Sequence, residues 1–209
     1  MTDSRVVGAP ERRVHSPAVG TATAFVALGV VVGTWASRIP AVRRSTGLDN
    51  FELGFALLGI AAGALIAMPM VGRLVRPVGS GLLTAVGVGM CAIALPFTAL
   101  AGGFVTLALA LLGLGVSIGT LDVAMNAHAV AVEGASRRPL LASFHAAYSI
   151  GALAGAGGGA LAAALLVGAL ANFIAVAVAV ALASALLLPG RLLARTEASP
   201  QAPHPRACR

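Results

Sequence analysis

The sequence predicts an all-α integral membrane protein built as a bundle of six transmembrane helices. Six apolar stretches fill the chain from Ala18 to Leu193, with only short polar breaks between them. A hydrocarbon core about 30 Å thick requires about 20 apolar residues per helix, since each helical residue adds about 1.5 Å. The composition agrees, because 58% of the residues are hydrophobic, 10% are charged and the mean hydropathy is +0.95.

The polar breaks set the order and the limits of the six expected helices. Pro40 is expected to stop the first helix soon after its apolar stretch, because a proline inside a helix removes a hydrogen bond. Arg73 and Arg76 mark the break after the second helix, and Arg137 and Arg138 mark the break after the fourth. The predicted spans are 18–37, 51–72, 80–101, 104–132, 141–167 and 169–190.

Little of the chain is expected outside the membrane. Residues 1–17 form a predicted cytoplasmic tail that lacks a signal-peptide apolar core, so we interpret the first span as a retained helix. Residues 18–190 form the bundle. Residues 191–209 are predicted to be a disordered cytoplasmic tail, because Thr196 to Arg209 is rich in Pro, Ala and Arg and has no apolar periodicity.

The arginines predict the orientation of the bundle. The net charge is +7 and all 14 basic residues are arginines, most of them at helix ends. If the helices alternate, one side of the membrane holds only Arg38, Arg43 and Arg44, and the other eleven share the opposite side. The positive-inside rule then places both termini in the cytoplasm of a multi-pass protein of the cell membrane. This placement also explains the basic charge without nucleic-acid binding.

Small residues predict how the helices pack. Hydrophobicity cannot hold helices together in lipid, so close backbone approach and polar contacts must do so. Glycines recur at four-residue spacing in the pairs Gly29/Gly33, Gly59/Gly63, Gly115/Gly119, Gly151/Gly155 and Gly155/Gly159. These pairs predict a tight bundle. Cys91 within a helix and Cys208 in the tail are expected to be unpaired thiols.

Asp122 and Asn126 form the most informative polar pair. Asp122 is the only acid well within an apolar span, and an ionisable group at that depth costs several kcal/mol unless it has a partner or a function. Asn126 follows at i+4, so both side chains share one helix face. This face is predicted to bind a polar solute or a proton. A structural hydrogen bond or ion pair between helices is the alternative.

Two histidines lie near the same break. His145 opens the fifth span and forms a polar stripe with Tyr148 and Ser149, which fits either a solute or proton site or an interfacial belt. His128 follows Asn126 by two positions, so it points to another face, and we interpret it as interfacial or structural.

Arg38 ends the first span next to Trp35, a predicted interface anchor. Arg38 could hold an anionic group or pair with an acid such as Asp49. The interpretation favoured here is that it extends toward the membrane surface.

The sequence contains no motif typical of an enzyme. It has no metal-ligand spacing of His, Cys, Asp and Glu, no phosphate-binding loop and no Ser/His/Asp arrangement. We therefore expect no catalytic residues, metal or cofactor, and any transport must draw on a gradient.

Three segments resemble the major facilitator superfamily: Gly33–Pro40, Leu121–His128 and Arg138–Gly151. Their order and spacing are similar to a bacterial subgroup near the fucose-permease-like branch. The resemblance covers about residues 18–190 and implies the N-terminal six-helix half of a transporter. In this family the solute lies between two helical bundles that rock around it.

The resemblance also points to a gating loop between the second and third helices. Gly72, Leu74 and Gly79 match the family pattern, but Arg76 replaces the acid that normally forms the gating ion pair. That pair therefore cannot be carried over, although Gly72, Arg76 and Gly79 remain the candidate gating residues.

The resulting prediction is secondary active, proton-coupled transport of a small, sugar-like polar solute. Asp122, Asn126, His145 and Arg38 are the predicted pathway residues. The expected partners are the lipid bilayer, the solute, and either a C-terminal half or a second copy of the chain. A truncated fragment that does not transport and a six-helix membrane scaffold are the alternatives.

Overall fold

The computed structural model describes residues 17–187 and consists of six long helices joined by short turns. The predicted all-α bundle of six membrane-spanning helices is confirmed, since all six are long and apolar enough to cross a membrane. The predicted tails lie almost entirely outside the described residues. The helices are α1 (Pro17–Thr46), α2 (Asn50–Val78), α3 (Ser80–Phe97), α4 (Phe104–Ser136), α5 (Leu141–Ala164) and α6 (Ala169–Leu187).

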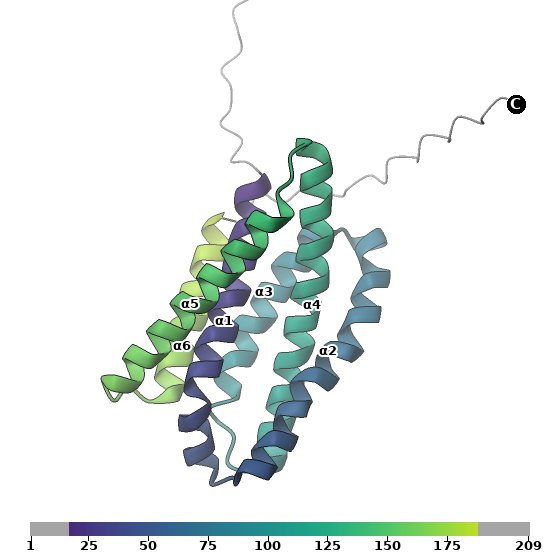
Figure 1. Cartoon of the computed structure of the whole chain (residues 1–209). Coiled ribbons are helices and arrows are strands. Elements are labelled where there is room, and N and C mark those ends of the chain that lie inside the picture. The colour runs from purple at the N-terminus through teal and green to yellow at the C-terminus, as the bar shows by residue number, and fades with distance from the viewer. Residues whose placement is uncertain (1–16, 188–209) are drawn as a thin grey trace, which may run out of the picture.

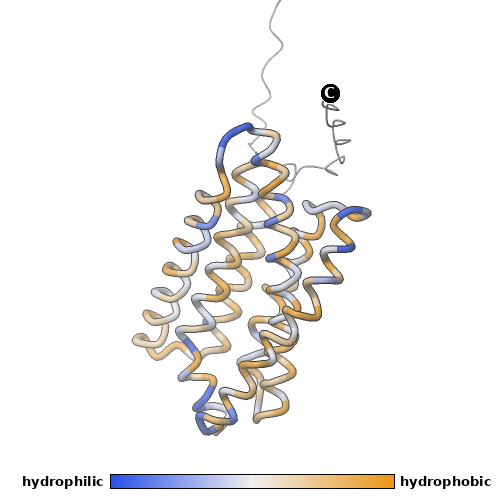
Figure 2. The backbone as a smooth tube through the Cα atoms, turned by 45° about the vertical axis from the view of Figure 1, so that its right-hand side comes forward, coloured by the Kyte–Doolittle hydropathy of each residue, from blue (hydrophilic) through white to orange (hydrophobic). Residues whose placement is uncertain are grey.

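The helices alternate in direction, so the bundle has two ends (Figure 1). The Arg137 end holds the start of α1, the α2–α3 turn and the α4–α5 turn. The Gly47 end holds the α1–α2, α3–α4 and α5–α6 turns. Figure 2 shows that hydrophilic residues are concentrated at these two ends and hydrophobic residues lie between them, as expected for a bundle that crosses a bilayer.

The prediction that Pro40 stops the first helix is wrong. Helix α1 continues through Pro40 to Thr46 and ends at Gly47, whose φ of 69° belongs to the left-handed region. The Gly47 N–H donates to the Arg43 carbonyl at 3.1 Å, which closes the last turn. Proline is tolerated inside membrane helices because neighbouring groups satisfy the backbone that it frees.

The expected loop between the second and third helices is also helical for most of its length. Helix α2 runs to Val78, and Gly79, with φ of 95°, is the single residue that joins it to α3. Gly72 and Arg76 therefore lie within α2, and only Gly79 lies in a turn. The prediction of a gating loop is therefore wrong, because the segment that contains Gly72 and Arg76 is helical.

Two helix pairs, α1 with α5 and α2 with α4, form the closest contacts of the bundle, and glycines create both of them. Gly33 of α1 lies directly against the backbone of Ala152 in α5, and Gly155 of α5 lies against Val30 of α1. Gly63 of α2 lies in the same way against α4. A Cβ at these positions would overlap backbone atoms, so the predicted tight packing through glycine pairs is confirmed.

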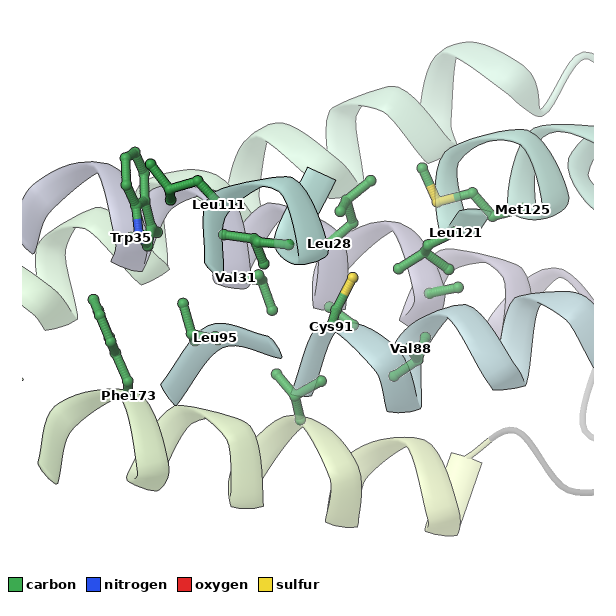
Figure 3. Close-up of a cluster of buried hydrophobic side chains, with 14 of the residues drawn as sticks. Leu28, Val31, Trp35, Val88, Cys91, Leu95, Leu111, Leu121, Met125 and Phe173 are labelled. Atoms are coloured by element: carbon green, nitrogen blue, oxygen red, sulfur yellow. The ribbon is translucent and has the colours of Figure 1, made fainter. Parts of the chain in front are cut away.

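Helix α3 and helix α6 close the bundle from behind and contribute to its core. Leu28, Val31 and Trp35 of α1 meet side chains of α3, α4 and α6 in one apolar cluster (Figure 3). Cys91 of α3 is buried in this cluster as a free thiol, as predicted, and Cys208 lies outside the described residues.

Carboxylates hold two of the turns. Asp49 and Glu52 cap the start of α2, because each side chain accepts a hydrogen bond from the backbone N–H of the other. Glu133, near the end of α4, accepts from the N–H groups of Leu140 and Leu141 at 2.6 and 2.8 Å. This carboxylate closes the α4–α5 turn and fixes the direction in which α5 begins.

Candidate functional site

Asp122 and Asn126 lie next to each other on α4, as their spacing predicts. The Asn126 side-chain amide donates to Asp122 Oδ1 at 3.1 Å and to the Asp122 carbonyl at 2.8 Å. Both side chains are half-buried. The amide therefore fixes one carboxylate oxygen, and no hydrogen bond to the described residues occupies the other.

His145, the fifth residue of α5, completes this cluster from a second helix. It lies close enough to Asp122 for the two groups to interact electrostatically. The imidazole packs edge-on against the ring of Phe25 in α1, with 5.4 Å between ring centroids, and Phe144 stacks on the same ring at 5.6 Å. Phe25 is fully buried whereas His145 is exposed, so an aromatic wall supports the histidine from one side only.

The two helices that carry these side chains, α4 and α5, both contact α1, and α2 packs against α4 (Figure 1). We call Asp122, Asn126 and His145 the Asp122 cluster. It combines a carboxylate, an amide and an imidazole, so it can donate and accept hydrogen bonds and exchange a proton. The other residues of the predicted polar stripe contribute less, because the Ser149 hydroxyl donates to its own helix at the His145 carbonyl.

Arg38 does not join this cluster, and the prediction that it extends toward the membrane surface is wrong. Its side chain is 3% exposed. The guanidinium donates to the carbonyl of Gly159 in α5 and to that of Val167 in the α5–α6 turn. Arg38 follows Phe25 on α1 by about 20 Å of helix, so it lies toward the opposite end of the bundle from His145. Its contacts tie α1 to the end of α5.

Replacing Arg38 with lysine is expected to lower the free energy of unfolding by about 1–3 kcal/mol. A lysine ammonium donates from one nitrogen, whereas the planar guanidinium reaches the two carbonyls from two separate nitrogens. The midpoint of unfolding in a detergent–SDS titration measures the effect, with exposed Arg73→Lys as the control. An Arg38→Lys midpoint equal to that of the control would show that the two contacts contribute nothing to stability.

His128 is buried within the bundle, which favours the structural one of the two interpretations. It is fully buried between helices, and its Nδ1 lies 3.1 Å from the Ser80 hydroxyl at the start of α3. Among the described residues, Nε2 has no hydrogen-bond partner. This pair connects α4 to α3 on a face away from the Asp122 cluster, and sequence spacing gave no sign that Ser80 would be its partner.

The candidate gating residues do not form a cluster with other side chains. Gly72 and Arg76 are exposed on α2, and a side chain at Gly72 would meet no neighbour within 4 Å. Within residues 17–187, no group of three or more His, Cys, Asp or Glu side chains could hold a metal ion.

Comparisons with known proteins point to transport. The chain is 37% identical over 142 residues to an uncharacterized MFS-type transporter of Yersinia pestis, a match that covers 68% of this chain and 37% of that protein. It is 41% identical over 151 residues to an uncharacterized transporter of Sinorhizobium fredii, covering 69% of this chain and 38% of the relative. The chain is similar to MFS-type transporters.

A third match is to a protein named as a membrane protein. The membrane protein MosC of Rhizobium meliloti is 32% identical over 131 residues. The chain spans somewhat more than a third of the length of the first two relatives and 32% of the third. No family model and no solved structure matches the chain. Together with the six apolar helices, these relatives support a multi-pass membrane protein that is similar to proteins named as transporters.

Proposed function

We propose that the six helices act as one half of a secondary active transporter that moves a small polar solute, sugar-like in its hydroxyl groups, together with a proton. The observation that carries this proposal is the Asp122 cluster. It places a half-buried carboxylate with one unbonded oxygen, near the middle of α4, within electrostatic reach of an exposed imidazole on α5.

The cluster needs a covering surface. Lipid tails cannot hydrogen-bond a carboxylate, an amide and an imidazole, and each polar group at such depth costs a few kcal/mol. A second bundle packed against these side chains would enclose the cluster and leave a water-filled path between the two bundles. That bundle is either a C-terminal half or a second copy of this chain. The relatives support a second bundle, because they are more than twice as long as the matched segment.

Coupling to a proton follows from the same side chains. An ionised Asp122 attracts a proton, and hydrogen bonds from a solute hydroxyl to the free carboxylate oxygen would change the proton affinity of the site. His145 offers a second titratable group within electrostatic reach. The Asn126 side-chain carbonyl supplies an acceptor for a solute hydroxyl, while its amide N–H groups donate to Asp122.

We propose that both termini lie in the cytoplasm, with the Gly47 end outside. To test this, Ser45→Cys is introduced into a chain that carries Cys91→Ala and Cys208→Ala. Ser45 is exposed at the Gly47 end, so a membrane-impermeant thiol reagent should label it in intact cells. Ser136→Cys, exposed at the other end, should react only after lysis. The reverse pattern would invert the orientation.

Reconstitution tests the half-transporter proposal directly. The purified 209-residue chain should show no uptake as a monomer in proteoliposomes, because the Asp122 cluster then lacks its second wall. It should self-associate in detergent, and supplying a second bundle should restore uptake of labelled hexoses or polyols driven by a pH gradient. Robust uptake by a demonstrably monomeric preparation contradicts the proposal. If neither second bundle restores uptake of any solute in the panel, the scaffold alternative replaces it.

A further inference from the structure

A small pocket at the Gly47 end has a composition unlike the rest of the apolar surface. It encloses about 380 Å³ and is lined by Pro40, Arg43, Arg44, Gly47 and Leu48. Two arginines therefore lie beside one another around a cavity at the last turn of α1. The proposed transport function makes no use of these residues.

Neither arginine is neutralised by the described part of the chain. Arg43 uses only its Nε, which donates to the Leu48 carbonyl at 3.2 Å, and both of its terminal nitrogens remain available. The Arg44 side chain makes no hydrogen bond to the described residues. The nearest acids in sequence, Asp49 and Glu52, are occupied by the capping box at the start of α2. Two arginines with unused guanidinium donors thus line the pocket.

The pocket lies where lipid headgroups are expected. Helix α1 has 30 residues and is therefore about 45 Å long, which exceeds the hydrocarbon thickness of about 30 Å, so its last turns reach the headgroup region. Phe51 and Phe55 in the first turns of α2 are exposed and pack together with 4.7 Å between ring centroids. Exposed aromatic side chains beside a charged helix end are typical of the membrane–water interface.

We propose that the pocket of Arg43 and Arg44 binds the phosphate group of an anionic phospholipid. Guanidinium forks match phosphate oxygens with paired, charge-assisted hydrogen bonds. The lipid glycerol and acyl chains continue into the bilayer beside the phenylalanines. The bound lipid offsets one of the two positive charges and holds the α1–α2 turn at the membrane surface.

The test compares lipid retention by the full 209-residue chain in native mass spectrometry. The chain is taken from nanodiscs that contain equal amounts of dioleoylphosphatidylglycerol and dioleoylphosphatidylcholine. The wild-type chain should retain the anionic lipid in preference to the neutral one. Arg43→Gln/Arg44→Gln should lose this preference, and exposed Arg73→Gln/Arg76→Gln, with two charges removed at the Arg137 end, should keep it.

Arg43→Lys/Arg44→Lys keeps the charge but removes the planar fork, so it should retain less anionic lipid than the wild type. This variant tests the proposal if the glutamine variant does not fold. Equal loss of preference in the Arg73/Arg76 control would assign the effect to overall charge and overturn the proposal. Displacement of the lipid by sn-glycerol 3-phosphate at equal concentration would assign the pocket to soluble phosphates and also overturn it. Unchanged retention by both the glutamine and the lysine variants would exclude the pocket.

Discussion

Replacing Asp122 with asparagine is expected to abolish gradient-driven uptake, down to the level of protein-free vesicles, while the bundle stays folded. Asparagine has nearly the same shape as aspartate, and its carbonyl oxygen can still accept the 3.1 Å hydrogen bond from Asn126. It carries no titratable proton, however, so the solute can no longer be coupled to the proton gradient. Solute exchange across the membrane should survive, because exchange does not require the proton to cycle.

The measurement uses the complete two-bundle transporter in vesicles with an imposed pH gradient and a panel of labelled hexoses and polyols. Asp122→Glu serves as the matched control, since it restores a titratable carboxyl at the cost of one extra methylene. It should recover part of the uptake. If the Asp122→Asn variant takes up solute at the wild-type rate and is expressed normally, Asp122 is structural and the proton-coupled proposal is wrong.

The spacing of Asp122 and Asn126 was sufficient to predict that they share a face, because one helix alone decides it. The approach of His145 could not be predicted in the same way. Its distance from Asp122 depends on which faces of α4 and α5 turn toward α1, and helices that are apolar all round carry no hydrophobic stripe that reveals this. The glycine pairs hold that information, because they mark the sides on which backbones touch.

A single wrong helix boundary explains two wrong predictions at the end of α1. The first span was predicted to end at residue 37, so Trp35 and Arg38 were expected near the membrane surface. The helix continues to Thr46, so both residues lie two to three turns inside it and are 6% and 3% exposed. The partners of Arg38 are backbone carbonyls of Gly159 and Val167, and a sequence pattern contains no signal for a backbone acceptor that distant along the chain.

Replacing Gly155 with leucine is expected to separate α5 from α1 and to lower the free energy of unfolding by about 3 kcal/mol or more, above the usual cost of overpacking. A Cβ at this position would overlap the Val30 carbonyl and approach the Thr34 nitrogen to 3.0 Å. These are backbone atoms, which cannot rotate away as a flexible side chain can. The Thr34 hydroxyl also donates to the Gly155 carbonyl at 3.3 Å, so separating the helices breaks this bond as well.

Gly157→Leu is the matched control, because it lies two residues along the same helix and a side chain there would meet nothing within 4 Å. The two variants gain the same side chain and the same helix propensity, so the difference between their unfolding midpoints in an SDS titration isolates the contact with α1. Equal midpoints would show that the glycine contact does not hold the pair together. A lower midpoint for Gly155→Leu alone would establish that close backbone approach assembles the α1–α5 pair, on which the position of His145 beside Asp122 depends.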